Sequence, residues 1–402
     1  MDRVPLTGSE AERFLLKEGD LLFARQSLVL EGAGKCSLFL KDDEPVTFES
    51  HVTRVRLDAS KAHSHFYFYY LRSPLGQAAI RSIVEQGAGA SGIRGSDLGT
   101  LDVQWRPVDE QQAIADVLGA LDDKIELNRR VNETLEAIAR ALFKSWFVDF
   151  DPIRVKAEGR DPGLPRPIAD LFPVRFIESE LGKIPEGWEV DMVSNHLAEL
   201  EVGGRPKGGV SAYADGIPSI GAKSIVGLGV FDYSKTKYIP KQFFEGMTRG
   251  HIKNRDVLLY KDGGRPGAFE PQLTLVDDGF PFAVCAINEH VYRLRAPKEL
   301  GQNFLYFWLS SDLSMEEMRM KGTGVAVPGL NSTQVKSLTI LVPPPAITAA
   351  FEAAVGPLVT RVLASCNESC TLATLRDELL PKLISGELRV SEAERVVAEA
   401  AA

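Results

Sequence analysis

The sequence predicts an α+β protein in which two mixed α/β domains are joined by two long antiparallel coiled-coil helices. Three observations lead to this fold class: an internal repeat, short apolar runs that alternate with Gly-rich turns inside each copy, and two long stretches of helical apolar spacing. The chain has 402 residues. Single cores seldom grow past roughly 250 to 300 residues, so we expect at least two cores.

The repeat appears as four pairs of similar segments in the same order. They are EGDLLFAR (18–25) with NRDVLLYK (254–261), ESHVTRVRL (49–57) with NEHVYRLRA (288–296), HFYFYYLRSPLG (65–76) with NFLYFWLSSDLS (303–314), and GAGASGIRGSDL (87–98) with GTGVAVPGLNSTQV (322–335). The offset is 236 from Asp20 to Asp256, 239 from His51 to His290 and 237 from Pro107 to Pro344. We therefore expect two copies of one structural unit.

The two copies begin differently. The second starts near Gly182 with GKIPEGWEV, 74 residues before Asp256, whereas 19 residues precede Asp20. A counterpart of EVGGRPKGGVSAYADGIPSIGAKSI is missing from the first copy, so its domain is expected to be N-terminally incomplete. One stretch in each copy, 66–71 in the first and 304–309 in the second, is predicted to form a helix. Its aromatic side chains either form an apolar face or stack on bases.

Two long helices follow the two copies. Apolar positions step by 4 and 3 through Ile114, Leu118, Leu121, Ile125, Asn128, Asn132, Leu135, Ala139, Leu142 and Trp146, and adding 237 gives Phe351, Val355, Leu358, Val362, Ser365, Ser369, Leu372, Arg376, Leu379 and Leu383. We call each row of positions a helix seam; both seams become polar at equivalent positions of the repeat. If the helices are antiparallel, Asn128 and Asn132 meet Ser365 and Ser369 and fix the register; alternatively, the helices expose their middles.

This pattern divides the chain into six segments. A helix of about 38 residues spans about 57 Å, which is long enough to separate two domains by more than one turn of DNA, about 34 Å. Pro, Asp and Arg are frequent after the first helix, which favours an extended linker. The expected segments are a first domain at 1–107, a helix at 108–148, the linker at 149–181, a second domain at 182–345, a helix at 346–390 and a tail at 391–402.

Composition limits the class of protein. The net charge is −9, which argues against a surface that is basic all over. Part of the acidity lies in 108–148 and 346–402, each with five basic and eight acidic residues, whereas 182–345 has 18 of each. No membrane span or secretion signal is apparent, so we expect a cytoplasmic protein. The four cysteines are too scattered for a disulfide framework, and the Cys366 and Cys370 pair lacks further metal ligands nearby.

No catalytic or cofactor motif is recognisable. EGAGKC (31–36) and GGRPKGG (203–209) lack the spacing of a phosphate-binding loop. His63 and His65 could face one way, but two imidazoles do not make a metal site. We therefore expect no enzymatic activity, no cofactor and no metal in this chain.

Basic side chains on Gly-rich loops are the candidates for DNA contacts, because backbone and guanidinium groups can there approach phosphates and base edges. An ordinary solvated charge is the alternative for each. The candidates are Arg205, Lys207, Lys223, Lys261, Arg265 and Lys321 in the second copy, and Arg25, Lys35 and Arg94 in the first.

As a whole, the chain resembles the specificity subunits of type I restriction-modification systems. The resemblance is carried by the repeat, by VPPP leading into a long helix, by EQQAIADVLGALDDKIELNRRVNETLEAIARALFKSWFVDFDP, by GKIPEGWEV and by LRDELLPKLISGELRV. It implies two target recognition domains that read a bipartite site on double-stranded DNA. It also implies docking of two modification (methyltransferase) subunits and of ATP-dependent restriction subunits. A protein-binding scaffold that keeps the coiled coil but has lost full DNA recognition is the alternative.

Overall fold

The structure is a computed structural model that describes residues 3–87, 89–265, 267–277, 279–322, 324 and 327–401. The chain forms two compact units. Unit 1 comprises residues 1–126 and 370–402, and unit 2 comprises residues 127–369. The long helices α5 (Val108–Phe147) and α12 (Pro345–Ser385) each contribute to both units.

Unit 1 is built on an antiparallel sheet with the strand order β3-β1-β4. A smaller sheet has the order β2-β6-β5. The strands are β1 (Leu21–Ala24), β2 (Gln26–Ser27), β3 (Cys36–Leu38), β4 (Val52–Val55), β5 (Glu85–Gln86) and β6 (Ser91–Gly92), and the helices are α1 (Gly8–Phe14), η1 (Leu30–Gly32), α2 (Ser64–Arg72), α3 (Pro74–Ser82), α4 (Gly95–Leu98) and the C-terminal α13 (Val390–Ala401).

The core of unit 1 joins this sheet to the helices. Leu21 and Phe23 from β1 and aromatic residues of α2, including Phe66, are buried with Leu118 of α5 and Leu383 of α12. The apolar positions expected on the long helices thus face the domain and each other. Ser73 begins α3 by accepting a hydrogen bond from the Gly76 N–H at 3.3 Å, which satisfies one of the free donors of the first turn.

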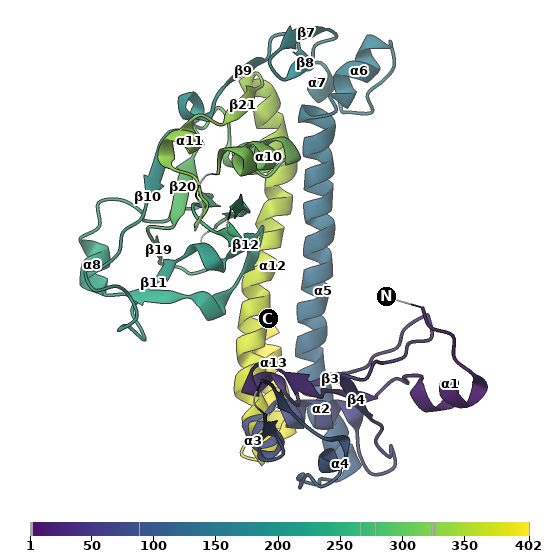
Figure 1. The fold of residues 1–402 in the computed structure, drawn as a ribbon. Helices are drawn as coiled ribbons and strands as arrows, with labels where there is room; N and C mark the ends of the chain where they lie inside the picture. The colour runs from purple at the N-terminus through teal and green to yellow at the C-terminus, as the bar shows by residue number, and fades with distance from the viewer. Residues whose placement is uncertain are drawn as a thin grey trace. The chain divides into compact units, whose positions relative to one another are not determined.

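Unit 2 has a four-stranded antiparallel sheet with the order β10-β20-β15-β18. Its strands β10 and β20 lie side by side (Figure 1). A second sheet has the order β14-β11-β19, and β21 pairs with β9. The strands are β7 (Phe176–Ser179), β8 (Gly182–Pro185), β9 (Glu189–Met192), β10 (Glu199–Val202), β11 (Ile217–Ile220), β12 (Ile225–Gly227), β13 (Val230–Phe231), β14 (Lys237–Ile239), β15 (Val257–Tyr260), β16 (Gly264–Arg265), β17 (Ala268–Phe269), β18 (Leu273–Leu275), β19 (Ala286–Ile287), β20 (Val291–Arg295) and β21 (Thr339–Val342).

The helices of unit 2 pack on this framework. They are α6 (Asp151–Ala157), α7 (Arg166–Ala169), η2 (Val193–His196), η3 (Ala222–Ser224), η4 (Tyr233–Lys235), α8 (Lys241–Glu245), α9 (Gln302–Leu309), α10 (Asp312–Lys321) and α11 (Ser332–Lys336). An aromatic cluster anchors α9 to the long helices: the rings of Phe143 and Phe147 lie 6.0 and 4.9 Å from that of Phe304, and the Phe147 ring lies 5.1 Å from that of Phe351. Helices 66–71 and 304–309 are confirmed as α2 and α9.

Inside each unit, α5 and α12 run antiparallel. In unit 1, Arg106 lies just before α5 and donates to the Ile384 C=O, and Asp122 pairs with Arg376. In unit 2, Asn132 contacts Cys366 and Phe143 contacts Phe351. Residues further along α5 therefore contact residues earlier in α12, as expected for antiparallel helices. The predicted fold class, α+β with a pair of long helices, is confirmed.

One expectation from the sequence needs correction. The segment 149–174 is not an extended linker: it contains α6 and α7 and buries Phe150, Ile153 and Phe172 in the core of unit 2. Prolines in the first turns of both short helices suit those positions, because the N–H that proline lacks has no helical partner there. In addition, α12 is by length and composition apolar enough to cross a membrane. Its side chains Phe351, Val355 and Val359 instead belong to the core of unit 2.

Candidate nucleic-acid interface

The internal repeat places Arg25 and Lys261 at the same structural position. The Arg25 N–H donates to the His51 C=O at 2.8 Å, and the Lys261 N–H donates to the His290 C=O at 2.9 Å. The Arg25 C=O accepts from Ile93 at 2.9 Å, and the Lys261 C=O accepts from Leu330 at 2.8 Å. Each cation therefore stands at the end of a central strand, β1 or β15, where it meets a Gly-rich loop.

Directly before the central strand, each copy contains a buried aspartate that accepts hydrogen bonds from an arginine. Asp20 accepts from the Lys17 N–H at 2.8 Å and from Arg56 at 2.6 Å. Asp256 does the same with the Lys253 N–H at 2.7 Å and with Arg295 at 2.9 Å. Charge-assisted hydrogen bonds of this kind fix the loop before the central strand. The sequence signal was the repeated Asp together with the repeated Arg-x-Arg, and its structural role was missed.

In unit 2 the network is larger. The Arg293 guanidinium is buried and contacts Asp256 at 3.2 Å, Glu201 at 2.7 Å and Glu199. Burial opposes ionisation of Glu199, but hydrogen bonds from Lys253 and Arg293 outweigh it and hold the pKa of Glu199 below its ordinary value. Both glutamates come from β10, so this strand supplies the carboxylates that neutralise Arg293.

Arg205 and Lys261 come together at the turn between β19 and β20. Arg205 Nη1 lies 3.3 Å from Glu289 Oε1, and Lys261 Nζ lies 3.3 Å from the Glu289 carbonyl oxygen and 6.0 Å from the centre of the Tyr292 ring. His290 Nδ1 lies 2.8 Å from Asp262 Oδ1 at the same turn. The sequence singled out the two cations but gave no signal that this turn joins them.

The loop that carries Arg205 and Lys207 is bounded by two glycines that tolerate no side chain. A Cβ on Gly203 would lie 1.7 Å from the Ile287 carbonyl oxygen, and one on Gly216 would lie 2.5 Å from that of Ile239. Gly216 also has a φ of +129°, a region that L-residues rarely adopt. The loop thus enters and leaves the sheets at two fixed points, while Lys207 between them is exposed.

Three of the candidates in unit 2 present exposed cationic side chains. They are Lys207, Lys223 in η3, and Arg265 in the two-stranded β16–β17 ribbon. Within the described part of the chain, none of the three is assigned a hydrogen bond or ion pair. Exposed cations without an internal partner are those that can neutralise phosphates at little cost.

Lys321 differs from these three. Its Nζ donates to the Ser337 carbonyl oxygen at 2.6 Å and the Ser337 hydroxyl at 3.0 Å, and it pairs with Glu317 at 2.9 Å. The side chain joins the end of α10 to the end of α11. These internal bonds favour a structural role, because a DNA phosphate would have to compete with them.

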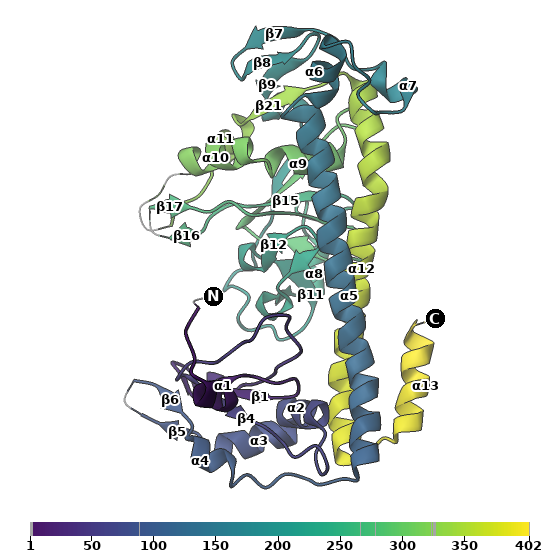
Figure 2. The same cartoon turned by 90° about the vertical axis from the view of Figure 1, so that its right-hand side faces the viewer.

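In unit 1, Arg25 and Arg94 line one groove of about 320 Å³ together with residues of β5 and β6. These two strands lie side by side (Figure 2). Arg25 donates to the Ser50 carbonyl oxygen at 2.8 Å, and Arg94 pairs with Glu85 at 2.8 Å, both on the surface. Lys35 is exposed beside β3, and its carbonyl accepts from the Ala24 N–H at 3.0 Å. The groove holds two cations and one carboxylate, so it is less cationic than the loops of unit 2.

The polar residues of the helix seams meet in unit 2. Asn128 is buried and donates through Nδ2 to Glu368 at 3.0 Å, to the Ser369 hydroxyl at 3.3 Å and to the Ser365 carbonyl oxygen at 3.5 Å. Asn132 Nδ2 lies 3.3 Å from Cys366 Sγ. A buried amide held in this way makes a shifted register costly, because its hydrogen bonds would be lost.

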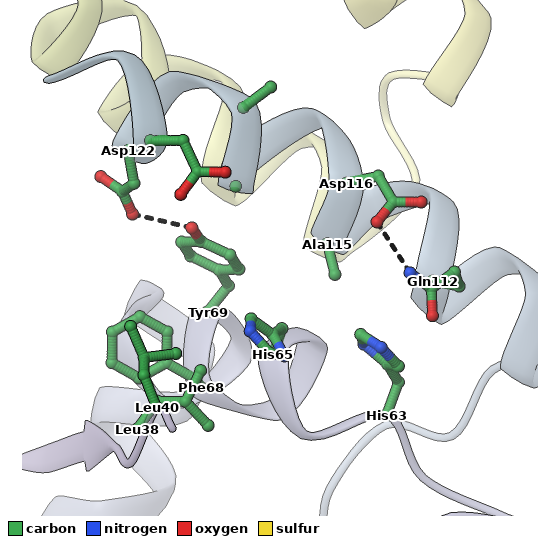
Figure 3. A pocket seen from close by; sticks show the side chains of 13 residues that line it. Leu38, Leu40, His63, His65, Phe68, Tyr69, Gln112, Ala115, Asp116 and Asp122 are labelled. Atoms are coloured by element: carbon green, nitrogen blue, oxygen red, sulfur yellow. Dashed lines mark hydrogen bonds between the residues drawn. The ribbon is translucent and has the colours of Figure 1, made fainter. Parts of the chain in front are cut away.

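His63 and His65 line a pocket of unit 1 between α2 and α5 (Figure 3). Their rings stack with centres 5.5 Å apart. Burial and the neighbouring His65 lower the pKa of His63, against a smaller opposing effect of Asp116. Tyr69 on the same wall donates to Asp122 at 2.7 Å. Among the described residues, no group of three or more His, Cys, Asp or Glu side chains is placed to hold a metal ion.

Comparison with known proteins adds independent information. The model of the type I restriction modification DNA specificity domain matches residues 7–137. The MjaIX type I restriction enzyme specificity subunit of Methanocaldococcus jannaschii is 27% identical over 81% of this chain and 69% of its own length. The HindI specificity subunit of Haemophilus influenzae is 25% identical over 93% and 87%.

A solved structure shows the same fold. The S subunit of a type I restriction-modification system from M. genitalium is 15% identical, with a TM-score of 0.52 over 92% of this chain and 84% of that one. At this identity the likeness concerns the fold alone. Together with the family model and the two relatives, it fits the repeated domains and the paired long helices, and the chain is similar over most of its length to type I restriction-modification specificity subunits.

Proposed function

We propose that this chain reads a bipartite site on double-stranded DNA through two target recognition domains, residues 1–107 and 182–345. The observation that carries the proposal is the duplicated position of Arg25 and Lys261, each at the end of the central strand and beside a Gly-rich loop. In unit 2, exposed Lys207, Lys223 and Arg265 add cations to the same domain. Arginine reaches guanine edges bidentately, and lysine neutralises phosphates.

The helices α5 and α12 would serve as the spacer between the two recognition domains, with Asn128 fixing their register. These helices would dock two modification subunits, through exposed carboxylates such as Asp109, Asp116 and Glu133 of α5, with restriction subunits joining that assembly in the cytoplasm. The relatives' names support an assembly of this kind, since they are specificity subunits of restriction enzymes. In this proposal the chain contributes recognition, and its partners contribute the chemistry.

The test uses the chain in complex with its modification subunits and a panel of fluorescent DNA duplexes. Arg265→Ala and Lys207→Gln should weaken binding. Because each phosphate contact contributes about −0.9 to the slope of log affinity against log salt, loss of one should make the slope shallower by about one unit. Lys298→Ala is the matched control. Lys298 is exposed and follows the C-terminal end of β20, whereas His290 stands at the N-terminal end of that strand. Unchanged affinity and salt slope in both variants would refute these contacts.

A scaffold that keeps the helix pair but has lost full DNA recognition is the second candidate. It is favoured by one observation: among the residues that the structure describes, the main sheet of unit 1 has three strands, whereas that of unit 2 has four. The two functions differ in one measurement. A scaffold would form a stable complex with the modification subunits whose DNA affinity is the same for every duplex in the panel.

A further inference from the structure

The main sheets of the two units match strand for strand except at one edge. The order β3-β1-β4 of unit 1 corresponds to β18-β15-β20 of unit 2, and unit 2 continues with β10. We propose that the free edge of β4 is a docking site for an extended acidic strand that takes the place β10 has in unit 2. We call this surface the β4 edge; it consists of residues 52–56, which are strand β4 and the arginine that follows it.

The backbone of the β4 edge is arranged to accept a strand. Antiparallel pairs alternate between hydrogen-bonded and non-hydrogen-bonded positions. The Arg25 N–H bonds the His51 C=O, so the alternation makes Phe23 and Thr53 a bonded pair and turns the N–H and C=O of Arg54 away from β1. Within the described residues, no backbone group is recorded as bonding either group of Arg54. Open edges of this kind are templates for an added strand.

The charge of the β4 edge specifies the chemistry of its occupant. Arg54 corresponds in the repeat to Arg293, whose guanidinium is buried between Glu199, Glu201 and Asp256. Arg54 instead donates to the Leu15 carbonyl oxygen at 3.1 Å and lies 5.6 Å from the centre of the Phe48 ring, with no carboxylate partner among the described residues. A strand with glutamate at alternate positions would therefore supply the missing carboxylates.

The apolar side chains lead to the same conclusion. In β20, Val291, Tyr292, Arg293 and Leu294 are all buried, whereas every residue of β4 remains partly exposed. The sequences VYRLR and VTRV are alike, so the difference in burial comes from what covers the strand rather than from its composition. An added strand would bury this surface and so gain hydrophobic free energy besides its hydrogen bonds.

Two other occupants fit less well. If the β4 edges of two copies paired around their centres, each Arg54 would face another arginine, and like charges directly opposite each other are destabilising. Duplex DNA could neutralise Arg54 and Arg56 through phosphates but would leave the backbone N–H and C=O of Arg54 without the ladder that a strand provides.

The test measures binding of a fluorescein-labelled peptide with the sequence of residues 197–204, LAELEVGG, to the full chain by fluorescence anisotropy. Unit 2 already contains its own β10, so the β4 edge is the open site. A peptide with both glutamates changed to glutamine should bind about tenfold more weakly, as expected for loss of hydrogen bonds between charged groups. Hydrogen exchange at residues 52–56 should slow when the acidic peptide binds.

Charge reversal distinguishes specific docking from misfolding. Arg54→Glu should abolish binding of LAELEVGG and restore binding of LAKLKVGG, a rescue that an unfolded variant could not show. Arg81→Glu makes the same change of charge on an exposed residue of α3 and should leave LAELEVGG binding unchanged. The proposal is overturned if LAELEVGG fails to bind, if it binds Arg54→Glu equally well, if the chain dimerises through residues 52–56, or if duplex DNA displaces the peptide from them.

Discussion

The two buried aspartates of the repeat allow one prediction to be made as a matched pair. Asp256→Ala removes an acceptor from the Lys253 N–H, from Arg295 and from the buried Arg293. Breaking a buried ion pair by removing one partner costs about 3 to 5 kcal/mol, and because Glu199 and Glu201 still neutralise Arg293, the lower end of that range applies here. We expect unit 2 to lose stability in that range.

Asp20→Ala should cost less. The side chain of its partner Arg56 is 34% exposed, compared with 2% for Arg293, so water can solvate the guanidinium once the carboxylate is gone. The remaining loss is that of the Lys17 N–H acceptor and of one partly solvated ion pair, about 1 to 3 kcal/mol. The same substitution in two copies of one motif thus separates the effect of burial from the effect of residue type.

Urea unfolding provides the assay. Trp146, Trp188 and Trp308 are buried in unit 2, so tryptophan fluorescence reports chiefly on that unit, and hydrogen exchange of the β1 and β15 amides reports on both. The fluorescence midpoint of Asp256→Ala should fall by about 1 M urea or more. The Asp256→Asn side chain can still accept from the Lys253 N–H, so the urea midpoint of this variant should lie between those of the wild type and Asp256→Ala. Equal losses at the two aspartates would refute the argument from burial.

Three further predictions concern other buried polar groups. Asn128→Ala should destabilise unit 2 by about 1 to 2 kcal/mol in urea unfolding, because three acceptors lose their donor, whereas exposed Arg130→Ala on the same helix should change stability by less than half as much. Burial raises the pKa of Glu352 above its usual value of 4.5, so ionisation of Glu352 destabilises the fold and its contribution to stability is lost as pH rises through and above 4.5. Glu352→Gln should therefore gain stability relative to the wild type between pH 4 and pH 8 in urea unfolding, and an unchanged difference between these two pH values would contradict the argument. Burial also raises the pKa of Cys36 and Cys285 to about 12, so at pH 8 iodoacetamide should modify both far more slowly in the native chain than in urea, as mass spectrometry of the tryptic peptides would show.

The sequence was most informative where structure depends on spacing. A nearly constant offset was enough to predict the repeat, the helices α2 and α9, and the meeting of Asn128 with Ser365 and Ser369, because helical and strand periods relate position in sequence directly to position in space.

Spacing gave no guidance where contacts join distant segments. The turn at Glu289 brings Arg205 and Lys261 together across 84 and 28 residues. The segment after α5 was mistaken for an extended linker because its prolines and charges concealed the apolar residues Phe150 and Phe172, which become buried only when unit 2 has folded.

Lys321 shows a third limit. Its neighbour Glu317 stands at i, i+4, a spacing that already indicates an ion pair on a helix, but the two bonds to Ser337 depend on how α10 meets α11. A lysine beside a Gly-rich segment thus resembles a DNA contact in sequence while it joins two helix ends in the structure.

The glycines at 203 and 216 give unit 2 a property of use to protein engineers. Since the chain must pass both points without a side chain, the twelve residues 204–215 between them form a cassette with fixed ends. Natural variation or laboratory libraries could replace its contents, Arg205 and Lys207 included, without altering the strands on either side. New specificities could then arise by exchange of one loop, provided that each insert ends at the same two glycines.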